Sequence, residues 1–479
     1  MSFEDITENK ETIVASTSQE NPLLTEEVIK IDEDSFTRAN VEALGNNIKL
    51  AERDEDNDLD LFCYVKCSSS DSNIVKQCRG VIFNGNNIVM KAFPYTVELS
   101  QFDRDIIESS FGSNFKDCRF YDSHEGALIR MFNFNDKWFT CTHRKLNAFK
   151  SKWASKESFG SSFKKALEAE VECNEKLKNA VADGDENLLE RFQMTLDKTK
   201  QYMFLVRNTS ENRIVCIPPT RPMLYHVGTF IKGELNLDED INIPKPNELK
   251  LESIDDLCKY VDDVDNKNFQ GVIVFAPNNC QYKILNKEYQ KFYRVRGNEA
   301  SIKFRYLQVR MNREYREMLY YLYPDMREVF DSYENILYDK ACAIHNSYIQ
   351  RYIKGSYVTL PKSEYEVMNK CHSWHVENRE TNKVDRNKVI DVLNQQNPTI
   401  LNRLIKEIIH QSKKPPEEAA DVNEVVEKLR KRSESNASAF GLSPVIIKKN
   451  DSYVPALSLP KSNFVKTNPK PRFLNTKNA

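Results

Sequence analysis

The sequence predicts an α+β protein: an antiparallel-sheet domain with an inserted helical hairpin, then an all-helical domain and a flexible tail. Three observations support this. Between residues 60 and 285, short runs rich in β-branched and aromatic residues are separated by turn residues. Inside this region, residues 161–200 change to helical spacing. From Tyr289 to His410 nearly every segment has helical spacing, and 479 residues are enough for two or three folded units.

The two ends of the chain differ in charge although the net charge of the whole chain is -2. Residues 1–60 carry 17 Asp or Glu and 5 Lys or Arg, and residues 1–35 have no clear periodicity, so an acidic flexible segment is expected there. Residues 441–479 carry 7 Lys or Arg and a single Asp. A basic, mostly disordered tail is therefore expected from 411 to 479, with one short helix at 421–432. Such a tail serves either as a solubilising linker or as an arm that binds nucleic acid or a partner.

The strands are expected as hairpins. A Gly-Asn pair at 85–86 separates two apolar runs, and an Asn-Asp pair at 135–136 separates two aromatic runs, which is typical of tight antiparallel turns. Five later runs continue the sheet region: YMFLVRN, NRIVCI, MLYHVGTFI, GVIVFAP and CQYKIL. Because these runs follow one another without intervening helices of crossover length, antiparallel sheets are favoured over a parallel one.

The helical parts follow from spacing and from breaks. Ala182-Asp183-Gly184-Asp185 interrupts the helical pattern of 161–200, which predicts two antiparallel helices joined by a tight turn. A domain boundary is expected near 295. The chain is thus divided into an acidic segment at 1–35, a sheet domain at 36–295, a helical domain at 296–410 and a basic tail at 411–479.

Eleven cysteines are scattered along the chain, and the odd number argues against a closed set of disulfides. Reduced thiols predict an intracellular, cytoplasmic protein. The chain has no run of 18 apolar residues and begins with an acidic segment, so neither a membrane span nor a signal peptide is expected. Cys371, His372 and His375 lack further ligands at short spacing, so no metal site is expected there.

Six short motifs carry the functional information, and their order along the chain matters more than any one of them. They are Cys78-Arg79-Gly80 with the run ending in Phe93-Pro94, Glu125-Gly126-Ala127-Leu128, Thr142-His143-Arg144-Lys145, Ser210-Glu211-Asn212-Arg213, Gln270-Gly271-Val272, and Tyr282-Lys283-Ile284-Leu285 followed by Tyr289. In this order they resemble the adenylyltransferase domain of the T4 RNA ligase 1 type over residues 60–295. The wording of 142–153 is also similar to the ligase-related proteins of large cytoplasmic DNA viruses.

The resemblance implies an ATP-grasp-like nucleotidyltransferase fold and a defined chemistry. In that family a lysine amine attacks the α-phosphate of ATP, with Mg²⁺ present, and the AMP is passed to the 5′-phosphate of an RNA end. Counting back three residues from Gly126 reaches Ser123 in place of that lysine. The neighbouring His124 is the one side chain that could form a phosphorus–nitrogen bond instead; otherwise it is a pocket-lining residue.

Three further positions depart from the family pattern. Val206 stands where the family has an acidic residue, Gln270 where it has Glu, and Leu285 where it has a lysine that contacts the α-phosphate. A carboxylate would orient the ribose or a divalent cation, and a cation would stabilise the charge that develops during phosphoryl transfer. No catalytic residue is therefore assigned, and ATP with Mg²⁺ is expected only by resemblance.

Several family positions keep a residue that suits a nucleotide or a phosphate, and these are the binding candidates: Arg79, Glu125, Gly126, Arg130, Lys145, Arg213, Gln270 and Lys283. The glycines suit a role in the fold. The basic side chains suit either a solvated face or a remaining phosphate pocket.

The helical domain offers a second candidate surface, because basic residues between 303 and 316 are interleaved with tyrosines. They suit contacts with RNA, or else the tyrosines face a helical core and the charges face solvent. The function expected is that of a catalytically degenerate RNA-ligase-like protein that binds RNA or a protein partner. The alternatives are an active ATP-dependent RNA ligase, or a structural or virion-associated protein that keeps only the fold.

Overall fold

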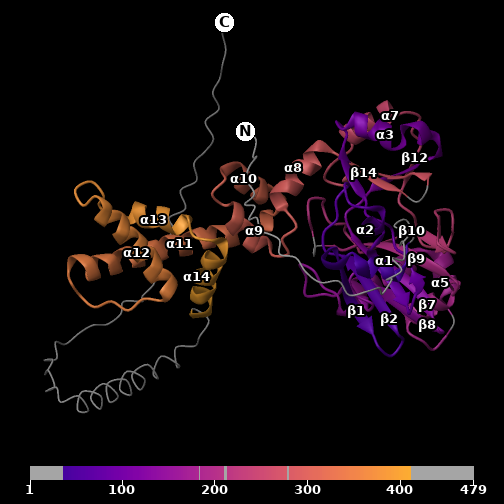
Figure 1. Cartoon of the computed structure of the whole chain (residues 1–479), viewed down its shortest axis with the longest axis horizontal. Coiled ribbons are helices and arrows are strands. Elements are labelled where there is room, and N and C mark those ends of the chain that lie inside the picture. The colour runs from indigo at the N-terminus through magenta and orange to yellow at the C-terminus, as the bar shows by residue number, and fades with distance from the viewer. Residues whose placement is uncertain (1–35, 183, 210–212, 278–279, 412–479) are drawn as a thin grey trace, which may run out of the picture. The chain divides into compact units, whose positions relative to one another are not determined.

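The computed structural model describes residues 36–182, 184–209, 213–277 and 280–411 (Figure 1). The chain forms two compact units, and Ile405 is the last residue of the first, which holds all of the sheets. The predicted acidic segment, the basic tail and its short helix at 421–432 lie outside the described residues. The predicted domain boundaries stay predictions.

Three sheets make up the sheet region, and each is built mainly from neighbouring antiparallel strands. Sheet A has the order β1-β2-β3-β4, sheet B the order β12-β6-β13-β14-β5, and sheet C the order β11-β10-β9-β7-β8. One pair, β14 with β5, is parallel. The bounds are β1 Ile48–Asp54, β2 Leu59–Tyr64, β3 Arg79–Asn84, β4 Asn87–Met90, β5 Val97–Ser100, β6 Arg119–Ser123, β7 Ala127–Phe134, β8 Lys137–Cys141, β9 Lys200–Arg207, β10 Met223–Ile231, β11 Glu234–Asn236, β12 Glu248–Leu249, β13 Gly271–Phe275 and β14 Gln281–Leu285.

Both predicted hairpin turns are confirmed. Gly85 joins β3 to β4 with φ +54°, and Asn135 and Asp136 join β7 to β8 with φ 50° and 61°. Two successive positive φ values match the twist of the flanking strands, which is why Asn and Asp serve there. The predicted strand NRIVCI is wrong for its described part, residues 213–217, which is an irregular loop.

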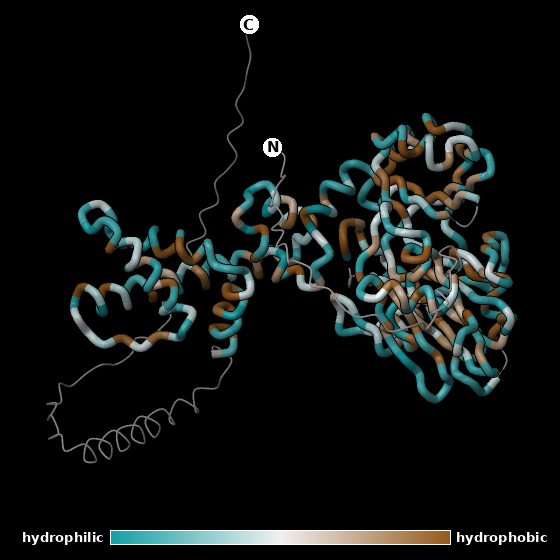
Figure 2. The backbone as a smooth tube through the Cα atoms, viewed as in Figure 1, coloured by the Kyte–Doolittle hydropathy of each residue, from teal (hydrophilic) through white to brown (hydrophobic). Residues whose placement is uncertain are grey.

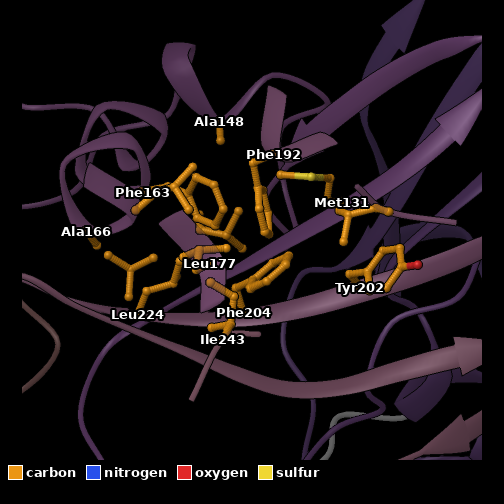
Figure 3. Packing of buried hydrophobic residues seen from close by; sticks show 14 of the residues in the cluster. Met131, Ala148, Phe163, Ala166, Leu177, Phe192, Tyr202, Phe204, Leu224 and Ile243 are labelled. Carbon is orange, nitrogen blue, oxygen red and sulfur yellow. The ribbon is translucent and has the colours of Figure 1, made fainter. Parts of the chain in front are cut away.

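Helices cover one face of sheet C. Their bounds are α4 Phe159–Cys173, α5 Glu175–Ala180 and α6 Leu188–Met194. Three helices therefore stand where two were predicted, because Asn174 ends α4 in an extended conformation and caps α5 through its side chain. Phe163 from α4 meets Phe204 from β9 edge to face, with ring centroids 5.2 Å apart (Figure 3). These contacts form the hydrophobic core on that side of the sheet.

The remaining short helices pack around sheets A and B, where many strand residues are hydrophobic (Figure 2). α3 and α7 share one cluster with β13 and β14 through Ile107, Leu257 and Val272. Their bounds are α1 Arg38–Ala43, α2 Asn73–Gln77, α3 Arg104–Phe111 and α7 Ile254–Asp263.

The predicted helical region after Tyr289 is confirmed. Its helices are α8 Lys287–Arg296, α9 Ile302–Val309, α10 Arg313–Leu322, α11 Arg327–Tyr348, α12 Lys362–Glu377, α13 Arg386–Asn394 and α14 Pro398–Gln411. Asn286 caps the start of α8, and its side chain accepts hydrogen bonds from the amides of Glu288 and Tyr289. This cap fixes where Tyr289 lies relative to the end of β14.

Candidate functional site: a cavity between two sheets

A cavity of about 200 Å³ lies between sheets B and C, at the connection that carries Ser123, His124, Glu125 and Gly126. This connection leaves sheet B at the end of β6 and enters sheet C at the start of β7. Side chains from both sheets line the cavity, including Leu128 and Leu205 from sheet C and Ile273 and Lys283 from sheet B. Motifs that are far apart in the sequence therefore meet around one space.

The connection fits closely against its neighbours. A Cβ atom added at Gly126 would lie 2.6 Å from the carbonyl oxygen of Val206, and one at Gly271 would lie 2.0 Å from that of Ile284. Gly271 also has φ +141°, which side chains of L-residues rarely allow. The glycines of two motifs are thus required by the close approach of strands.

Ser123 is 3% exposed and is held in a chain of hydrogen bonds. Its hydroxyl donates to Oε1 of Gln270 at 3.0 Å, and Nε2 of Gln270 donates to the hydroxyl oxygen of Tyr289 at 2.8 Å. Burial, and after it the nearby Glu125 carboxylate, raise the pKa of the Tyr289 hydroxyl well above its usual value. Because an amide oxygen is not a base that can take the serine proton, this arrangement does not activate the hydroxyl as a nucleophile.

His124 is also held in place. Its ring stacks on Tyr225 with centroids 5.0 Å apart and an interplanar angle of 9°, and Nδ1 lies 3.2 Å from Nη1 of Arg207. Burial and the Arg207 charge lower the pKa of His124 to about 4, so the ring is neutral at pH 7. Since a guanidinium can only donate, Nδ1 is the acceptor and its lone pair is occupied. The nitrogen route to a covalent nucleotide is therefore blocked at Nδ1.

Both carboxylate oxygens of Glu125 accept hydrogen bonds from backbone amides. Oε1 accepts from the amide of Val215 at 2.8 Å, and Oε2 accepts from the amide of Cys216 at 3.1 Å. Burial raises the pKa of Glu125, against the opposing effect of these hydrogen bonds. This candidate residue holds the loop at 213–217, whose Ile214 lines the cavity, and has no oxygen left without a partner.

Two predicted cations reach the cavity. Arg79 donates through Nη1 to the carbonyl of Pro94 at 3.3 Å and to Oγ1 of Thr96 at 3.2 Å. Nζ of Lys283 lies 3.4 Å from Oε1 of Glu98. Both therefore present positive charge at the cavity wall while keeping a partner.

Three of the candidates do not line this cavity. Arg130 is fully buried and donates to the carbonyls of Gly80 and Thr142, so it ties sheet A to sheet C. Nζ of Lys145 lies 3.3 Å from Oε1 of Glu52 on β1. These side chains support the fold around the site.

Arg213 is the third of them. Its guanidinium donates to the carbonyls of Val215, Cys216 and Leu322, the last of which ends α10. The guanidinium also lies over the ring of Tyr323, 5.6 Å from the ring centroid. It therefore fastens the loop to the helical region. The residues before it in that motif, 210–212, lie outside the described residues.

Two of the three positions that lack the family's charges belong to the hydrophobic core. Val206 is 3% exposed and packs in the core behind sheet C. Leu285 is 5% exposed and packs with Val215 and Tyr289. A carboxylate or an ammonium at either position would be buried without a partner, which is costly.

Several cavity residues were missed by the sequence analysis, among them Asp122, His226, Lys245 and Gln281. Asp122 accepts from Tyr260 at 2.6 Å and from Asn247 at 3.0 Å, so this buried carboxylate is satisfied within the protein. Gln281 is 3% exposed; its Oε1 accepts from Thr96, and its Nε2 has no partner among the described residues. Gln281 could have been found, because it stands two residues before Lys283 on the same face of β14.

The second candidate surface is the basic helical stretch at 303–316. Several of its side chains contact other residues of the helical region. Tyr306 is fully buried and stacks on Phe330 with centroids 4.4 Å apart. Arg310 is 7% exposed and pairs with Glu334, and Arg305 donates to the carbonyls of Arg294 and Val295. Tyr306 therefore faces the helical core as one alternative predicts, whereas Arg305 and Arg310 are engaged inside the helical region, where that alternative expects solvated charges. Lys303 and Arg313 are exposed and have no ion pair among the described residues.

No three His, Cys, Asp or Glu side chains converge as a metal site in the described parts of the chain. Cys371 is fully buried, and the ring of His372 stacks on Tyr352 with centroids 3.7 Å apart. Among the described helices, none has the length and apolar character needed to cross a bilayer.

The fold and the site define an α+β protein in which two mainly antiparallel sheets enclose a cavity with a cationic wall, followed by a helical region. No protein-family model matches the chain. It is 31% identical over 378 residues to an immediate-early protein ICP-46 homolog of Invertebrate iridescent virus 6, covering 74% of this chain and 81% of that protein. The chain therefore belongs to the family of the immediate-early protein ICP-46.

Two further relatives carry the same name. The homolog of Invertebrate iridescent virus 3 is 27% identical, with 66% of this chain and 69% of that protein covered. ICP-46 of Frog virus 3 is 27% identical, with 51% and 62% covered. The expected kinship with viral proteins is confirmed.

Among solved structures, an archaeal ATP-dependent RNA ligase is 10% identical with a TM-score of 0.32, covering 74% of each chain. A putative ATP-dependent DNA ligase from Aquifex aeolicus is 12% identical with a TM-score of 0.32, covering 69% of this chain and 86% of that one.

Proposed function

We propose that this protein is a catalytically degenerate, RNA-ligase-like protein that binds RNA and forms no covalent nucleotide adduct. The single observation that carries the proposal is the place of Ser123. By the resemblance this residue occupies the position of the nucleophile, and it is 3% exposed and donates a hydrogen bond to Gln270. A hydroxyl nucleophile needs a neighbouring base, and the amide oxygen that accepts this hydrogen bond is not one.

The ligase-like part of the proposal is supported by the way in which residues of separate motifs meet at one cavity. Arg79, Glu125, Gln270 and Lys283 are spread over about 200 residues of sequence, and all four line one cavity. A chance resemblance of short motifs gives no reason for them to meet. The retained cations Arg79 and Lys283 suit phosphate, while Leu285 and Val206 lie in the core and supply no charge.

A further part of the proposal is that the protein acts inside the cell, and the free cysteine thiols support it. Each of the eleven cysteines is free, and six of the eleven are buried, as is usual for a protein kept in a reducing compartment. We propose the cytoplasm of the infected cell as its place of action.

Two experiments test the proposal on the full chain. Incubation with α-labelled ATP and Mg²⁺, followed by a denaturing gel, is expected to leave the protein unlabelled. A labelled band that is lost in His124→Ala would overturn the degenerate part. Fluorescence anisotropy with labelled single-stranded RNA at low salt is expected to show binding that weakens as salt rises.

Charge also predicts how the ends act in that binding assay. Removing residues 1–35 is expected to strengthen RNA binding, because that segment is acidic, and removing 441–479 is expected to weaken it. Absence of RNA binding by the full chain and by both truncations would contradict the RNA part. A protein partner would then be the better proposal.

A further inference from the structure

Residues 144–156, named here the basic segment, have the sequence RKLNAFKSKWASK. They include five Lys or Arg and no Asp or Glu, in a chain whose net charge is -2. Two aromatic residues, Phe149 and Trp153, stand among the cations. Cations alternating with aromatic rings are typical of surfaces that bind single-stranded nucleic acid.

Four of the five cations are exposed and lack a carboxylate partner. Arg144, Lys150, Lys152 and Lys156 are exposed, and none of them forms an ion pair within the described residues. Lys145 is the exception because it pairs with Glu52. Exposed charges that are not neutralised by the protein remain free to neutralise phosphates.

Most of the basic segment has no regular secondary structure, but hydrogen bonds hold its backbone in place. Oγ1 of Thr142 accepts from the amide of Lys145 at 3.1 Å, and Oδ1 of Asn147 accepts from the amide of Phe149 at 2.8 Å. The carbonyl of Ser151 accepts from the amide of Phe159 at 2.9 Å, at the start of α4. The cations are thus presented on a preorganised support, which lowers the entropy cost of binding.

Both aromatic side chains remain partly accessible. Phe149 is 39% exposed and packs on Gly160, where an added Cβ would lie 2.6 Å from its ring. Trp153 is half-buried, and the guanidinium of Arg296 from α8 lies 5.8 Å from its ring centroid. A ring held by its scaffold offers a flat surface on which a base can stack.

The two sides of the basic segment differ in charge. On one side, Phe149 and Lys150 adjoin a groove of about 700 Å³ that is lined by Glu52, Asp54 and other acidic residues of the β1–β2 hairpin. Those carboxylates repel a polynucleotide. On the other side, Trp153 contacts α8, on which Arg294 is exposed and, among the described residues, has no ion pair. At its start the segment follows His143, whose backbone lies against Gly80, next to the cavity residue Arg79.

We propose that the basic segment binds the backbone of single-stranded RNA, with phosphates on Lys152 and Lys156 and a base stacked on Trp153. The inference rests on the proposed function for the choice of RNA and deepens it by naming the surface. Apart from the one-turn 3-10 helix Ala148–Lys150 the backbone is irregular, and it presents no helix or ribbon long enough to enter a duplex groove, so a single strand is the form that fits. The acidic hairpin keeps the strand on the side of α8.

The test compares two matched double variants of the full chain. Lys152→Gln/Lys156→Gln removes two unpaired charges of the basic segment. Lys49→Gln/Lys116→Gln removes two exposed lysines elsewhere that also have no ion pair among the described residues. Binding of labelled oligouridylate is measured by anisotropy over a range of salt concentrations. The first variant is expected to lose affinity by about tenfold at low salt and to reduce the salt slope by about 1.4, because each phosphate contact contributes about 0.7. The control is expected to change neither.

Trp153→Leu separates stacking from charge. It is expected to weaken binding at least about fivefold while leaving the salt slope unchanged, because base stacking does not release counterions. Thermal unfolding of each variant, compared with the wild type, identifies any change in binding that comes from loss of the fold.

The outcomes distinguish this inference from the proposed function. If the wild type binds RNA and both segment variants bind it equally well, the surface is wrong and the proposed function stands. If the wild type binds no RNA, the proposed function itself fails. If oligothymidylate binds as tightly as oligouridylate, the basic segment is a site for single-stranded DNA as well as single-stranded RNA. Equal binding of polyglutamate would overturn the proposal in favour of an acidic protein partner.

Discussion

The hydroxyl of Ser123 donates a hydrogen bond to Oε1 of Gln270, with 3.0 Å between the two oxygens. The strands that lead to these residues are also paired, since the amide of Gln270 donates to the carbonyl of Ser123 at 2.8 Å. Two positions at which the resembling family carries a lysine and a carboxylate are thus occupied by a neutral, mutually satisfied pair. This uncharged pair forms part of the cavity wall.

Restoring the lysine alone is expected not to restore ligation. In Ser123→Lys the new ammonium would replace a 3% exposed side chain beside Gln270, with Leu285 and Val206 still uncharged. A gel-based assay of RNA end joining and of AMP labelling is expected to show neither product. Ser123→Ala, which removes only the hydrogen bond, is the control for stability and is expected to cost about 1 kcal/mol. Ligation by the single lysine variant would show that the surrounding site is intact.

ATP is expected to bind weakly and with little dependence on Mg²⁺. Arg79 and Lys283 can meet phosphates, but Asp122 is satisfied by Tyr260 and Asn247 and is not free to hold a cation. Titration calorimetry with and without Mg²⁺ measures this, and Lys283→Ala is expected to weaken whatever binding is found. A tight complex that requires Mg²⁺ would move the balance to an active enzyme.

Acid is expected to destabilise the fold through His226. This residue is 1% exposed, and burial lowers its pKa from 6.5 to about 4. Because the unfolded chain takes up the proton first, the stabilisation is complete above pH 6.5 and is lost as the pH falls toward 4. The loss amounts to about 2–3 kcal/mol.

The measurement is urea unfolding between pH 7 and pH 4.5 for the wild type and for His226→Gln. The variant is expected to have a shallower pH dependence, although it also loses the contact of His226 Nε2 with Thr229 Oγ1 at 2.9 Å. Equal slopes for the two proteins would contradict a neutral buried imidazole.

Gly271→Ala is expected to prevent folding or to destabilise it by more than about 3 kcal/mol. The added methyl group would lie 2.0 Å from the backbone oxygen of Ile284, and the backbone there cannot move without breaking the pairing of β13 with β14. Gly45→Ala is the matched control, because it also has a positive φ, +55°, but nothing within 4 Å of the added carbon. It is expected to cost about 1 kcal/mol. Similar melting temperatures for the two variants would contradict the steric argument.

Glu125→Ala is expected to cost about 2–3 kcal/mol and to loosen the loop at 213–217. The substitution leaves the amides of Val215 and Cys216 without their acceptors. Hydrogen exchange at these two amides is expected to rise by more than exchange in β9. Glu125→Gln keeps one acceptor oxygen and is expected to lose less, so equal losses would point to the charge in place of the hydrogen bonds.

The pattern of residues was sufficient for many of the strands, for the hairpin turns and for the helical region, because these depend on neighbours in the sequence. It wrongly placed a strand at 213–217 and missed others, among them β1 and β6. Gly85 and the Asn135-Asp136 pair set their turns through local backbone preferences, and the spacing after Tyr289 alone indicates helices. The Ser123 substitution was also visible from the motif. The third helix over sheet C was missed because the helical pattern is continuous across Asn174. The extended backbone of this residue ends α4, and its side chain caps α5.

The roles of the charged candidates were decided by tertiary structure. Arg79, Arg130, Arg213 and Lys283 look alike as retained cations in the sequence, yet two line the cavity and two donate to backbone carbonyls elsewhere. What separates them is which sheet edge or loop lies opposite each guanidinium or ammonium. That depends on the pairing of strands distant in sequence, such as β6 with β13. A long cationic side chain serves a phosphate or a carbonyl equally well, so its role follows from the partner that the fold brings within reach.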